Sequence, residues 1–341
     1  MQDSWVLSSN SLHLRDIYRE IAVKKITLGC LLIGLLTTQV YASFTARDDV
    51  SKWLNDSGDL GFTQDQVLQY LAQTKAKPSI VPVLRNAPEN KLKWSGYQKR
   101  LVSASRIKSG KAFVQKNAAQ LQQVAKETGV DAAIIAAIAG IESNYGANMG
   151  KHLALRVLAT LSFDYPRRSK FYQRQLAEFF RLCYSQGLDP TQVKGSAAGA
   201  VGMGQFIPTS YRDFAVDGDS DGRIDLFNSV DDNIASIAHY LARHRWQAGK
   251  PWLLTVDSLV EPAWVSKKAK RQGVPLSQWE ARGIALSSSI DAGEFNLYAF
   301  STENGNEYRL GGANFYAITR YNHSLWYARA VVEIAQGIAQ E

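Results

Sequence analysis

The sequence predicts a mostly α-helical protein that carries a small β insertion. The chain has 341 residues, of which 45% are hydrophobic, so it can build a core in one elaborated domain or two modest ones. Apolar residues at helical spacing alternate with polar or glycine-rich connections along most of the chain. Residues 286–312, LSSSIDAGEFNLYAFSTENGNEYRLGG, instead alternate polar and aromatic residues around an Asn-Gly pair, which is typical of a β-hairpin.

These changes of pattern divide the chain into five segments. We expect an N-terminal extension with a signal peptide (1–42), a helical N-terminal region (43–127), a core of apolar helices (128–252), a small β-containing insertion (253–313) and a C-terminal segment that ends in a helix (314–341). The sequence contains no internal repeat and no low-complexity tract.

The first segment has the pattern of a secretory signal. In KKITLGCLLIGLLTTQVYAS (24–43), two lysines precede an apolar stretch, and the small residues Val40 and Ala42 flank Tyr41. The apolar stretch is too short to predict a membrane span. We therefore expect export with cleavage before Ser43.

Neither of the two cysteines is expected to have a functional role. Cys30 follows a glycine as in a lipid-attachment motif, but Thr27 stands where that motif has leucine, so a lipid anchor is not expected. Cleavage of the signal leaves Cys183 alone, which excludes an internal disulfide even in an oxidising compartment. Cys183 lies in a helical pattern and is predicted to be a small core residue.

The chain is basic, with 39 Lys and Arg residues against 31 Asp and Glu. This excess favours an acidic partner, such as nucleic acid, anionic lipid or an acidic cell-wall polymer. We interpret the excess as diffuse, and no zinc-ligand spacing or other nucleic-acid motif accompanies it, so nucleic acid is not expected. Peripheral association with a membrane and the oligomeric state stay open.

One carboxylate has an unusual position. Glu142 in GIESNYG (140–146) directly follows an apolar run, VDAAIIAAIAGI (130–141), that predicts a helix. Gly129 is expected to close the preceding helix and Gly146 to end this one, and Asp131 is expected either to cap this helix or to lie in its first turn.

Glu142 is our candidate catalytic residue. It shares a helical face with Ile135 and Ile138, so it is expected to reach the interior or the wall of a cleft. Burial would raise its pKa and keep part of the population protonated near neutral pH, as a general acid requires. The alternative is a last-turn glutamate that points into water. No serine elbow, P-loop, dinucleotide fingerprint or HExxH spacing competes with it.

The segment DGDSDGRIDLFN (217–228) has the spacing of an EF-hand calcium loop. Its candidate ligands are the side chains of Asp217, Asp219, Asp221 and Asp225 and the main-chain carbonyl of Arg223. The last ligand of such a loop is usually a glutamate, but Asn228 stands there, so Asp231 or Asp232 is expected to replace it. We predict a structural Ca²⁺; the alternative is a solvated acidic turn that binds no ion.

A glycine-rich loop, GSAAGAVGMGQFIPTSY (195–211), follows the candidate acid in the chain. Its glycines allow a close approach of the backbone, while Gln205 and Phe206 supply an amide and an apolar plate. Such a loop can line a groove for a sugar, whose hydroxyl groups need polar partners and whose ring faces need apolar surface. The alternative is that the glycines mark close helix packing.

Several motifs together resemble one known family. IESNYG (141–146), LATLSFDYPRR (158–168), GAVGMGQFIPTSY (199–211), the EF-hand-like loop and NFYAITRYNHS (314–324) occur in the order found in the lytic murein transglycosylase B family. The resemblance extends from about residue 45 to the C-terminus. It implies a lysozyme-like catalytic core (128–252) with an EF-hand-like loop and an additional helical domain.

The resemblance also implies an activity. Members of the family cleave the β-1,4 bond between MurNAc and GlcNAc in the glycan strands of peptidoglycan and leave 1,6-anhydro-MurNAc ends. Glu142 matches their single catalytic acid, which protonates the glycosidic oxygen and then acts as a base toward the C6 hydroxyl. A typical glycosidase uses two carboxylates, and in this family the N-acetyl group of the substrate is thought to replace the second. An exported member would act in the periplasm.

Further residues match the family's groove one by one. Phe171 departs from the family pattern, where we expect tyrosine, and removes one potential hydrogen bond to substrate. The matching positions are Ser196, Gln205 and Phe206 in the glycine-rich loop, Arg167 and Arg168 in the YPRR element, and Tyr240, Tyr321, Asn322 and Tyr327 in an aromatic and amide wall.

Two other functions stay open at this point. A hydrolytic muramidase could use the same groove with water in place of the C6 hydroxyl. A non-catalytic peptidoglycan-binding protein could keep the groove without turnover.

Overall fold

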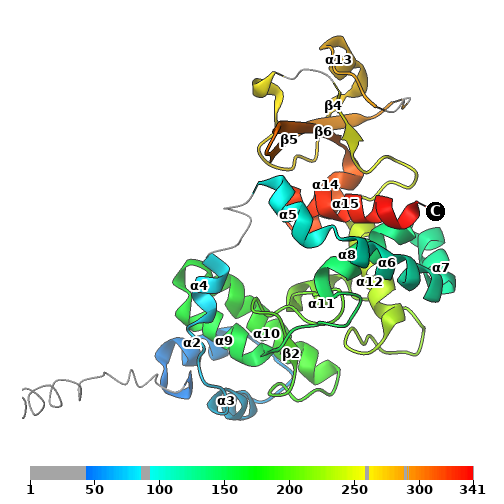
Figure 1. The fold of residues 1–341 in the computed structure, drawn as a ribbon. Coiled ribbons are helices and arrows are strands. Elements are labelled where there is room, and N and C mark those ends of the chain that lie inside the picture. The colour runs from blue at the N-terminus through cyan, green and yellow to red at the C-terminus, as the bar shows by residue number, and fades with distance from the viewer. Residues whose placement is uncertain (1–43, 86–92, 258–260, 288–289, 291, 341) are drawn as a thin grey trace, which may run out of the picture. The chain divides into compact units, whose positions relative to one another are not determined.

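The computed structural model describes residues 44–85, 93–257, 261–287, 290 and 292–340 (Figure 1). The predicted signal segment, 1–42, lies outside the described residues. The described chain is mostly α-helical with a small sheet, as predicted. Within it, no helix has the length and apolar character needed to cross a membrane.

The elements are named as in Figure 1. The helices are η2 (Phe44–Ala46), α2 (Asp48–Asp56), α3 (Gln64–Ala72), α4 (Ile80–Arg85), α5 (Trp94–Leu101), α6 (Ala104–Lys116), α7 (Ala118–Thr128), α8 (Ala132–Ser143), α9 (Ala154–Asp164), η4 (Pro166–Arg168), α10 (Ser169–Ser185), α11 (Pro208–Phe214), α12 (Val230–Arg243), η5 (Pro262–Trp264), α13 (Leu276–Ala281), α14 (Ala313–Tyr321) and α15 (Leu325–Ala339). The strands are β1 (His152–Leu153), β2 (Lys194–Gly195), β3 (Leu254–Thr255), β4 (Val274–Pro275), β5 (Glu294–Thr302) and β6 (Gly305–Gly311).

The α-helices outside the insertion share one hydrophobic core. Leu71 of α3, from the N-terminal region, is fully buried in the same cluster as Phe179 of α10 and Val331 of α15. Cys183 of α10 is also fully buried in this cluster, which confirms its interpretation as a core residue. The described N-terminal helices therefore pack on the core of the central helices, and no separate cluster is found among their described residues.

The insertion forms an antiparallel sheet with the strand order β3-β6-β5-β4. β5 and β6 are the predicted hairpin, in which Leu297 lies opposite Leu310 and Thr302 lies opposite Gly305. Gly305 has a φ of 111°, a conformation that glycine adopts without strain. The Asn-Gly pair therefore marks the turn, as predicted.

Both faces of β5 are covered. Successive side chains of a strand point to opposite faces. Phe295 and Leu297 pack in a small cluster within the insertion, whereas Tyr298 and Phe300 pack in the main helical core. This strand therefore ties the insertion to the helices through buried side chains.

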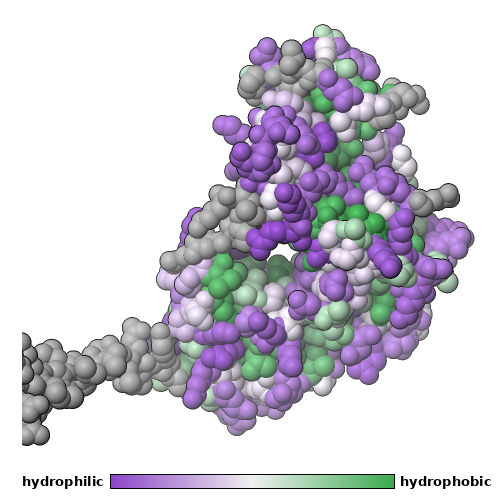
Figure 2. Space-filling view, viewed as in Figure 1, coloured by the Kyte–Doolittle hydropathy of each residue, from purple (hydrophilic) through white to green (hydrophobic). Residues whose placement is uncertain are grey.

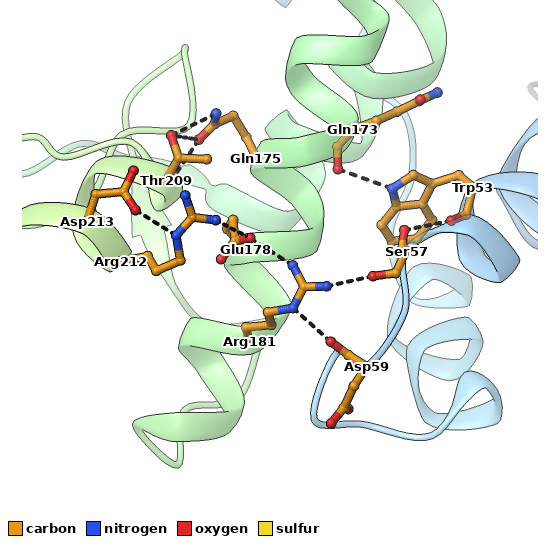
Figure 3. A network of polar contacts seen from close by, with 10 residues as sticks. All are labelled: Trp53, Ser57, Asp59, Gln173, Gln175, Glu178, Arg181, Thr209, Arg212 and Asp213. Atoms are coloured by element: carbon orange, nitrogen blue, oxygen red, sulfur yellow. Dashed lines mark hydrogen bonds and ion pairs between the residues drawn. The ribbon is translucent and has the colours of Figure 1, made fainter.

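A buried carboxylate fixes the helix that follows the glycine-rich loop (Figure 3). Glu178 of α10, 8% exposed, accepts hydrogen bonds from Arg181 at 2.8 Å and from Arg212 of α11 at 2.7 Å. Arg181 also donates to the carbonyls of Ser57 and Asp59 at 2.6 and 2.7 Å. α11 is thus held against α10, and α10 against the N-terminal region.

The face shown in Figure 2 is hollowed between the regions of α4 and α5, where hydrophobic and hydrophilic residues lie side by side.

Candidate active site

Glu142 lies in the last turn of α8. Gly129 adopts the left-handed conformation with a φ of 70° and ends the preceding helix, as predicted. α8 ends earlier than expected, because Asn144, with a φ of 52°, takes the left-handed position at its C-terminus. The prediction that Gly146 ends the helix is therefore wrong; asparagine tolerates this conformation better than most residues.

The carboxyl of Glu142 is held in a partly buried setting. Ile135 and Ile138, on the same face of α8, are fully buried. The Tyr327 hydroxyl at the start of α15 donates a hydrogen bond to Glu142 Oε1 at 2.6 Å. Burial raises the pKa of Glu142 from 4.5 to about 7, and this effect outweighs the hydrogen bond, which lowers it. Both protonation states are therefore populated near neutral pH.

A cluster of aromatic side chains extends from Glu142. The Tyr321 hydroxyl donates to the carbonyl of Gly204 at 2.6 Å, and its ring lies 5.7 Å from Phe206 and 4.8 Å from Tyr240. Tyr321 is partly exposed, whereas Phe206 is 2% and Tyr240 9% exposed. The two buried rings thus have little surface for a sugar and mainly support Tyr321.

The glycine-rich loop is shaped by its own polar side chains. The Ser196 hydroxyl accepts hydrogen bonds from the backbone N–H groups of Ala198 and Ala200 at 3.2 and 3.1 Å. Gln205 has a φ of 50°, and its amide nitrogen donates to the Met149 carbonyl at 3.1 Å and the Gly202 carbonyl at 2.8 Å. These bonds fix the Gln205 side chain between the loop and the segment after α8.

Asn233 of α12 is a site residue that sequence reasoning missed. It is 2% exposed, and its side-chain oxygen accepts from the Gly204 N–H at 3.1 Å. Its nitrogen donates to the carbonyls of Leu226 and Ser229 at 3.0 and 2.7 Å. Asn233 thereby joins the glycine-rich loop to the EF-hand-like segment 217–228, which we call the acidic loop. In the sequence, only its position beside Asp231 and Asp232 could have indicated a role for Asn233. That position suggested a contact with the acidic loop but not one with the glycine-rich loop.

The remaining predicted groove residues lie on the surface. Arg167, Arg168 and Asn322 are exposed. The Arg168 guanidinium stacks 4.1 Å from the centre of the Phe171 ring. The Asn322 side-chain oxygen accepts from the Ser324 N–H at 3.2 Å. Within the described residues, no hydrogen bond joins these three side chains to Glu142.

The acidic loop gathers three of its predicted ligands. One carboxylate oxygen from each of Asp217, Asp219 and Asp221 lies within 4.8 Å of the others. Asp217 accepts hydrogen bonds from the N–H groups of Asp221 at 3.2 Å and Gly222 at 2.8 Å, so the backbone winds around the carboxylates. Gly222 has a φ of 89° at the expected sharp turn. Hard oxygens in such a loop suit Ca²⁺. The Arg223 carbonyl stays a prediction.

The other predicted ligands lie outside this group of three. Asp225 accepts from the N–H groups of Phe227 and Asn228, at 2.9 and 3.0 Å. Asp232, 1% exposed, accepts from the N–H groups of Gly218 at 2.7 Å and Asp225 at 2.6 Å. Both oxygens of Asp232 thus brace the loop. Asp231 is partly exposed at the start of α12.

The buried carboxyl of Glu142 predicts a pH-dependent difference in stability. Its pKa is raised from 4.5 to about 7, so the folded state binds the proton more tightly than the unfolded state. Its contribution to stability is therefore lost as pH rises through this range. The free energy of unfolding of Glu142→Gln, relative to that of wild type, should therefore be higher at pH 8 than at pH 4.5 by on the order of 2–3 kcal/mol. Denaturant unfolding at both pH values checks this, and a constant difference would contradict it.

The sequence of this chain is similar to sequences of known proteins. The family model described as transglycosylase SLT domain matches residues 46–336. The membrane-bound lytic murein transglycosylase B of Escherichia coli (strain K12) is 33% identical over 304 residues, which are 86% of this chain and 82% of that protein.

Two solved structures are also similar. The E. coli lytic transglycosylase Slt35 in complex with calcium has a TM-score of 0.77 and 31% identity, and the match covers 87% of this chain and 94% of that one. SltB3 from Pseudomonas aeruginosa in complex with NAG-anhNAM-pentapeptide has a TM-score of 0.72 and 30% identity, covering 84% of this chain and 78% of that one.

Proposed function

Because the chain belongs to the transglycosylase SLT domain family and is thereby a peptidoglycan-cleaving lytic transglycosylase, we propose that it breaks the β-1,4 bond between MurNAc and GlcNAc and leaves a 1,6-anhydro-MurNAc end. The similar SltB3 is known in complex with NAG-anhNAM-pentapeptide, a fragment that contains such an anhydro sugar. The substrate of this chain would be the glycan strands of peptidoglycan.

The observation that carries this proposal is the setting of Glu142. Its pKa of about 7 reflects burial and the hydrogen bond from Tyr327, and no other described carboxylate contributes to it. A two-carboxylate glycosidase holds its acidic groups close together on either side of the bond. A lone acid instead favours a reaction in which the substrate supplies its own nucleophile.

In the proposed reaction, Glu142 acts first as an acid and then as a base, and a different proton moves in each step. The protonated carboxyl donates its proton to the glycosidic oxygen as the bond to C1 breaks, with the N-acetyl group of MurNAc as the internal nucleophile. The carboxylate then removes the proton from the C6 hydroxyl, whose oxygen attacks C1, displaces the N-acetyl oxygen from C1 and closes the anhydro ring. Glu142 is restored to its protonated form, so no water is consumed. The Tyr327 hydroxyl, 2.6 Å from Oε1, orients the carboxyl through both steps.

Mass spectrometry of purified peptidoglycan digested by the chain tests this reaction. Anhydro ends are expected. Reducing ends would instead identify a hydrolytic muramidase with the same groove, because water would have replaced the C6 hydroxyl. Binding without products would favour the non-catalytic peptidoglycan-binding protein.

We also propose that the acidic loop holds a structural Ca²⁺. Three carboxylates within 4.8 Å of one another fit a hard divalent cation, and Slt35, which is similar over most of the chain, is known in complex with calcium. Asp217, Asp219 and Asp221 would hold the ion. When bound, it would neutralise the charge that these carboxylates concentrate in one turn.

The calcium proposal predicts a selective effect of Asp219→Ala. If millimolar calcium is about 100 times the dissociation constant, binding stabilises the wild-type fold by about 2.7 kcal/mol, and the variant should lose most of this gain. Melting temperatures in calcium and in chelator measure it. The control is Asp65→Ala, an exposed aspartate in α3, which should change stability equally in both conditions. Equal losses for Asp219→Ala would remove this side chain from the calcium site.

We further propose that the protein is exported and acts in the periplasm. The motif in residues 24–43 supports this, together with a substrate that lies outside the cytoplasm. N-terminal sequencing of the exported protein is expected to give Ser43. A mature end upstream of Lys24 would contradict the proposal.

A further inference from the structure

Cationic side chains gather where the insertion approaches α12 and α14. Lys267, Lys268, Lys270 and Arg271 come from the segment between η5 and β4, Arg245 follows α12, and Arg320 lies near the end of α14. We call these six residues the basic cluster. They line two cavities of about 720 and 770 Å³, the first with Lys267, Lys268 and Arg320, the second with the other three. The interpretation of the basic excess as diffuse is therefore wrong at this place.

The charges of the basic cluster are not neutralised within the described part of the protein. None of the six side chains forms an ion pair with a described carboxylate. Glu294 is the single acidic residue among those that line the second cavity, and the first is lined by none. The Arg320 guanidinium stacks 4.6 Å from the Tyr316 ring, and its buried Nε has no described hydrogen-bond partner. Such an arrangement favours an anionic ligand.

The backbone that carries the lysines is fixed. Asn296 of β5, 6% exposed, donates through its side-chain nitrogen to the carbonyls of Lys270 at 3.2 Å and Gln272 at 3.0 Å. The Ser266 N–H donates to the Leu297 carbonyl at 2.8 Å. The backbone of the segment that carries these positive charges is therefore fixed by β5, a strand that is buried on both faces. This geometry lowers the entropy lost when a ligand binds.

The basic cluster continues the aromatic cluster that begins at Glu142. The Tyr240 hydroxyl donates to the Arg320 carbonyl at 2.5 Å, and the His244 ring stacks 4.2 Å from the Tyr240 ring. Tyr321, the next residue after Arg320, is close enough to Glu142 that burial and then the charge of this carboxylate raise the pKa of Tyr321. Arg320 therefore connects the basic cluster to the residues around Glu142.

Two histidines, His244 and His323, lie within the electrostatic influence of Arg320. Burial, followed by Arg320 and Arg168, lowers the pKa of His323. Burial also lowers the pKa of His244, and the charges of Arg320 and Arg243 lower it further. The hydrogen bond that His244 Nδ1 donates to the Tyr240 carbonyl opposes these effects. Burial is the largest cause in both cases, and Arg320 adds a smaller positive contribution to the electrostatic potential at both imidazoles.

We propose that the basic cluster is a subsite for the carboxylates of the stem peptides that branch from MurNAc. This inference rests on the proposed function, because it assumes that a glycan strand lies at Glu142. The sugar backbone itself offers few anions, whereas stem peptides carry several free carboxylates at a distance from the cleaved bond. Arginine binds a carboxylate through two parallel hydrogen bonds, and lysines add charge at the rim.

Binding of two matched ligands tests the subsite. The full chain with Glu142→Gln, which should bind without turnover, is titrated with a GlcNAc–MurNAc tetrasaccharide that bears tripeptide stems. The second ligand is the same molecule with its carboxylates converted to amides. Lys267→Gln with Lys268→Gln, and separately Arg320→Gln, should weaken binding of the first ligand about fivefold to tenfold and that of the second less than about twofold. Added salt should reduce the difference.

The matched control removes two charges elsewhere. Lys108→Gln with Lys126→Gln changes exposed lysines of α6 and α7 and should leave the affinity for both ligands unchanged. If the cluster variants weaken both ligands equally, or neither, the subsite is overturned while turnover at Glu142 can still stand. Loss of binding to phosphatidylglycerol vesicles, with both saccharides bound as before, would overturn it in favour of a lipid surface. If the parent chain neither binds nor cleaves any peptidoglycan fragment, the proposed function itself fails.

Discussion

Replacing Glu142 with glutamine is expected to reduce peptidoglycan turnover by about 10²- to 10⁴-fold, the range that general acid–base catalysis supplies. The amide has nearly the same shape as the protonated carboxyl, and its oxygen can still accept the Tyr327 hydrogen bond, which is 2.6 Å long in the wild type. It cannot donate a proton to the glycosidic oxygen and then take one back. The loss should therefore appear in kcat with little change in KM.

The measurement is the rate of anhydro-ended products, followed by mass spectrometry. Glu127→Gln is the matched control, because it makes the same chemical change on an exposed side chain of α7 and should leave the rate unchanged. The melting temperature of Glu142→Gln at neutral pH should not fall below that of wild type. Turnover near the wild-type rate in the folded variant would remove Glu142 from the mechanism.

Asn233→Ala is expected to cause the largest loss of stability among these variants. It removes an amide that accepts from the Gly204 N–H and donates to the Leu226 and Ser229 carbonyls. Because the site is 2% exposed, water cannot easily replace these bonds, and unfolding should become easier by about 3 kcal/mol. For a chain of this size that corresponds to a melting temperature lower by about 4 °C.

The effect of Asn233→Ala on activity shows whether Asn233 positions Gly204 in the active site or only stabilises the fold. The Gly204 carbonyl accepts the Tyr321 hydroxyl, so a displaced Gly204 should weaken substrate binding well below the melting temperature. Asn148→Ala is the control, since Asn148 is exposed and should tolerate the change. Thermal melts and kcat/KM at 25 °C test both parts. A melting temperature within about 1 °C of wild type would show that these bonds contribute little.

Much of the fold could be predicted because its signals are local. The apolar run before Glu142 gave the helix α8, and the Asn-Gly pair gave the hairpin of β5 and β6. The end of α8 was misplaced because a left-handed asparagine satisfied the helix terminus two residues before the available glycine. Turn geometry is thus harder to predict than the existence of an element.

The site was harder to predict where contacts join distant parts of the chain. Tyr327 was placed in a sugar-binding wall, but its hydroxyl contacts the carboxyl of Glu142, 185 residues earlier in the chain. Phe206 was expected beside the substrate, yet it is 2% exposed among other rings. Asp232 was a candidate metal ligand, and the sequence did not show that its oxygens accept hydrogen bonds from two backbone N–H groups. Residue type and spacing show what a side chain can bind but not which way it faces.

The raised pKa of Glu142, about 7, limits when the enzyme can work. Only the protonated carboxyl can start the proposed cycle, and the second step restores the proton. Acidifying the surroundings from neutrality therefore increases the competent fraction by no more than about twofold, whereas each pH unit above the pKa decreases it about tenfold. Peptidoglycan cleavage is therefore expected to continue at acidic pH and to slow about tenfold for each pH unit above the pKa of Glu142.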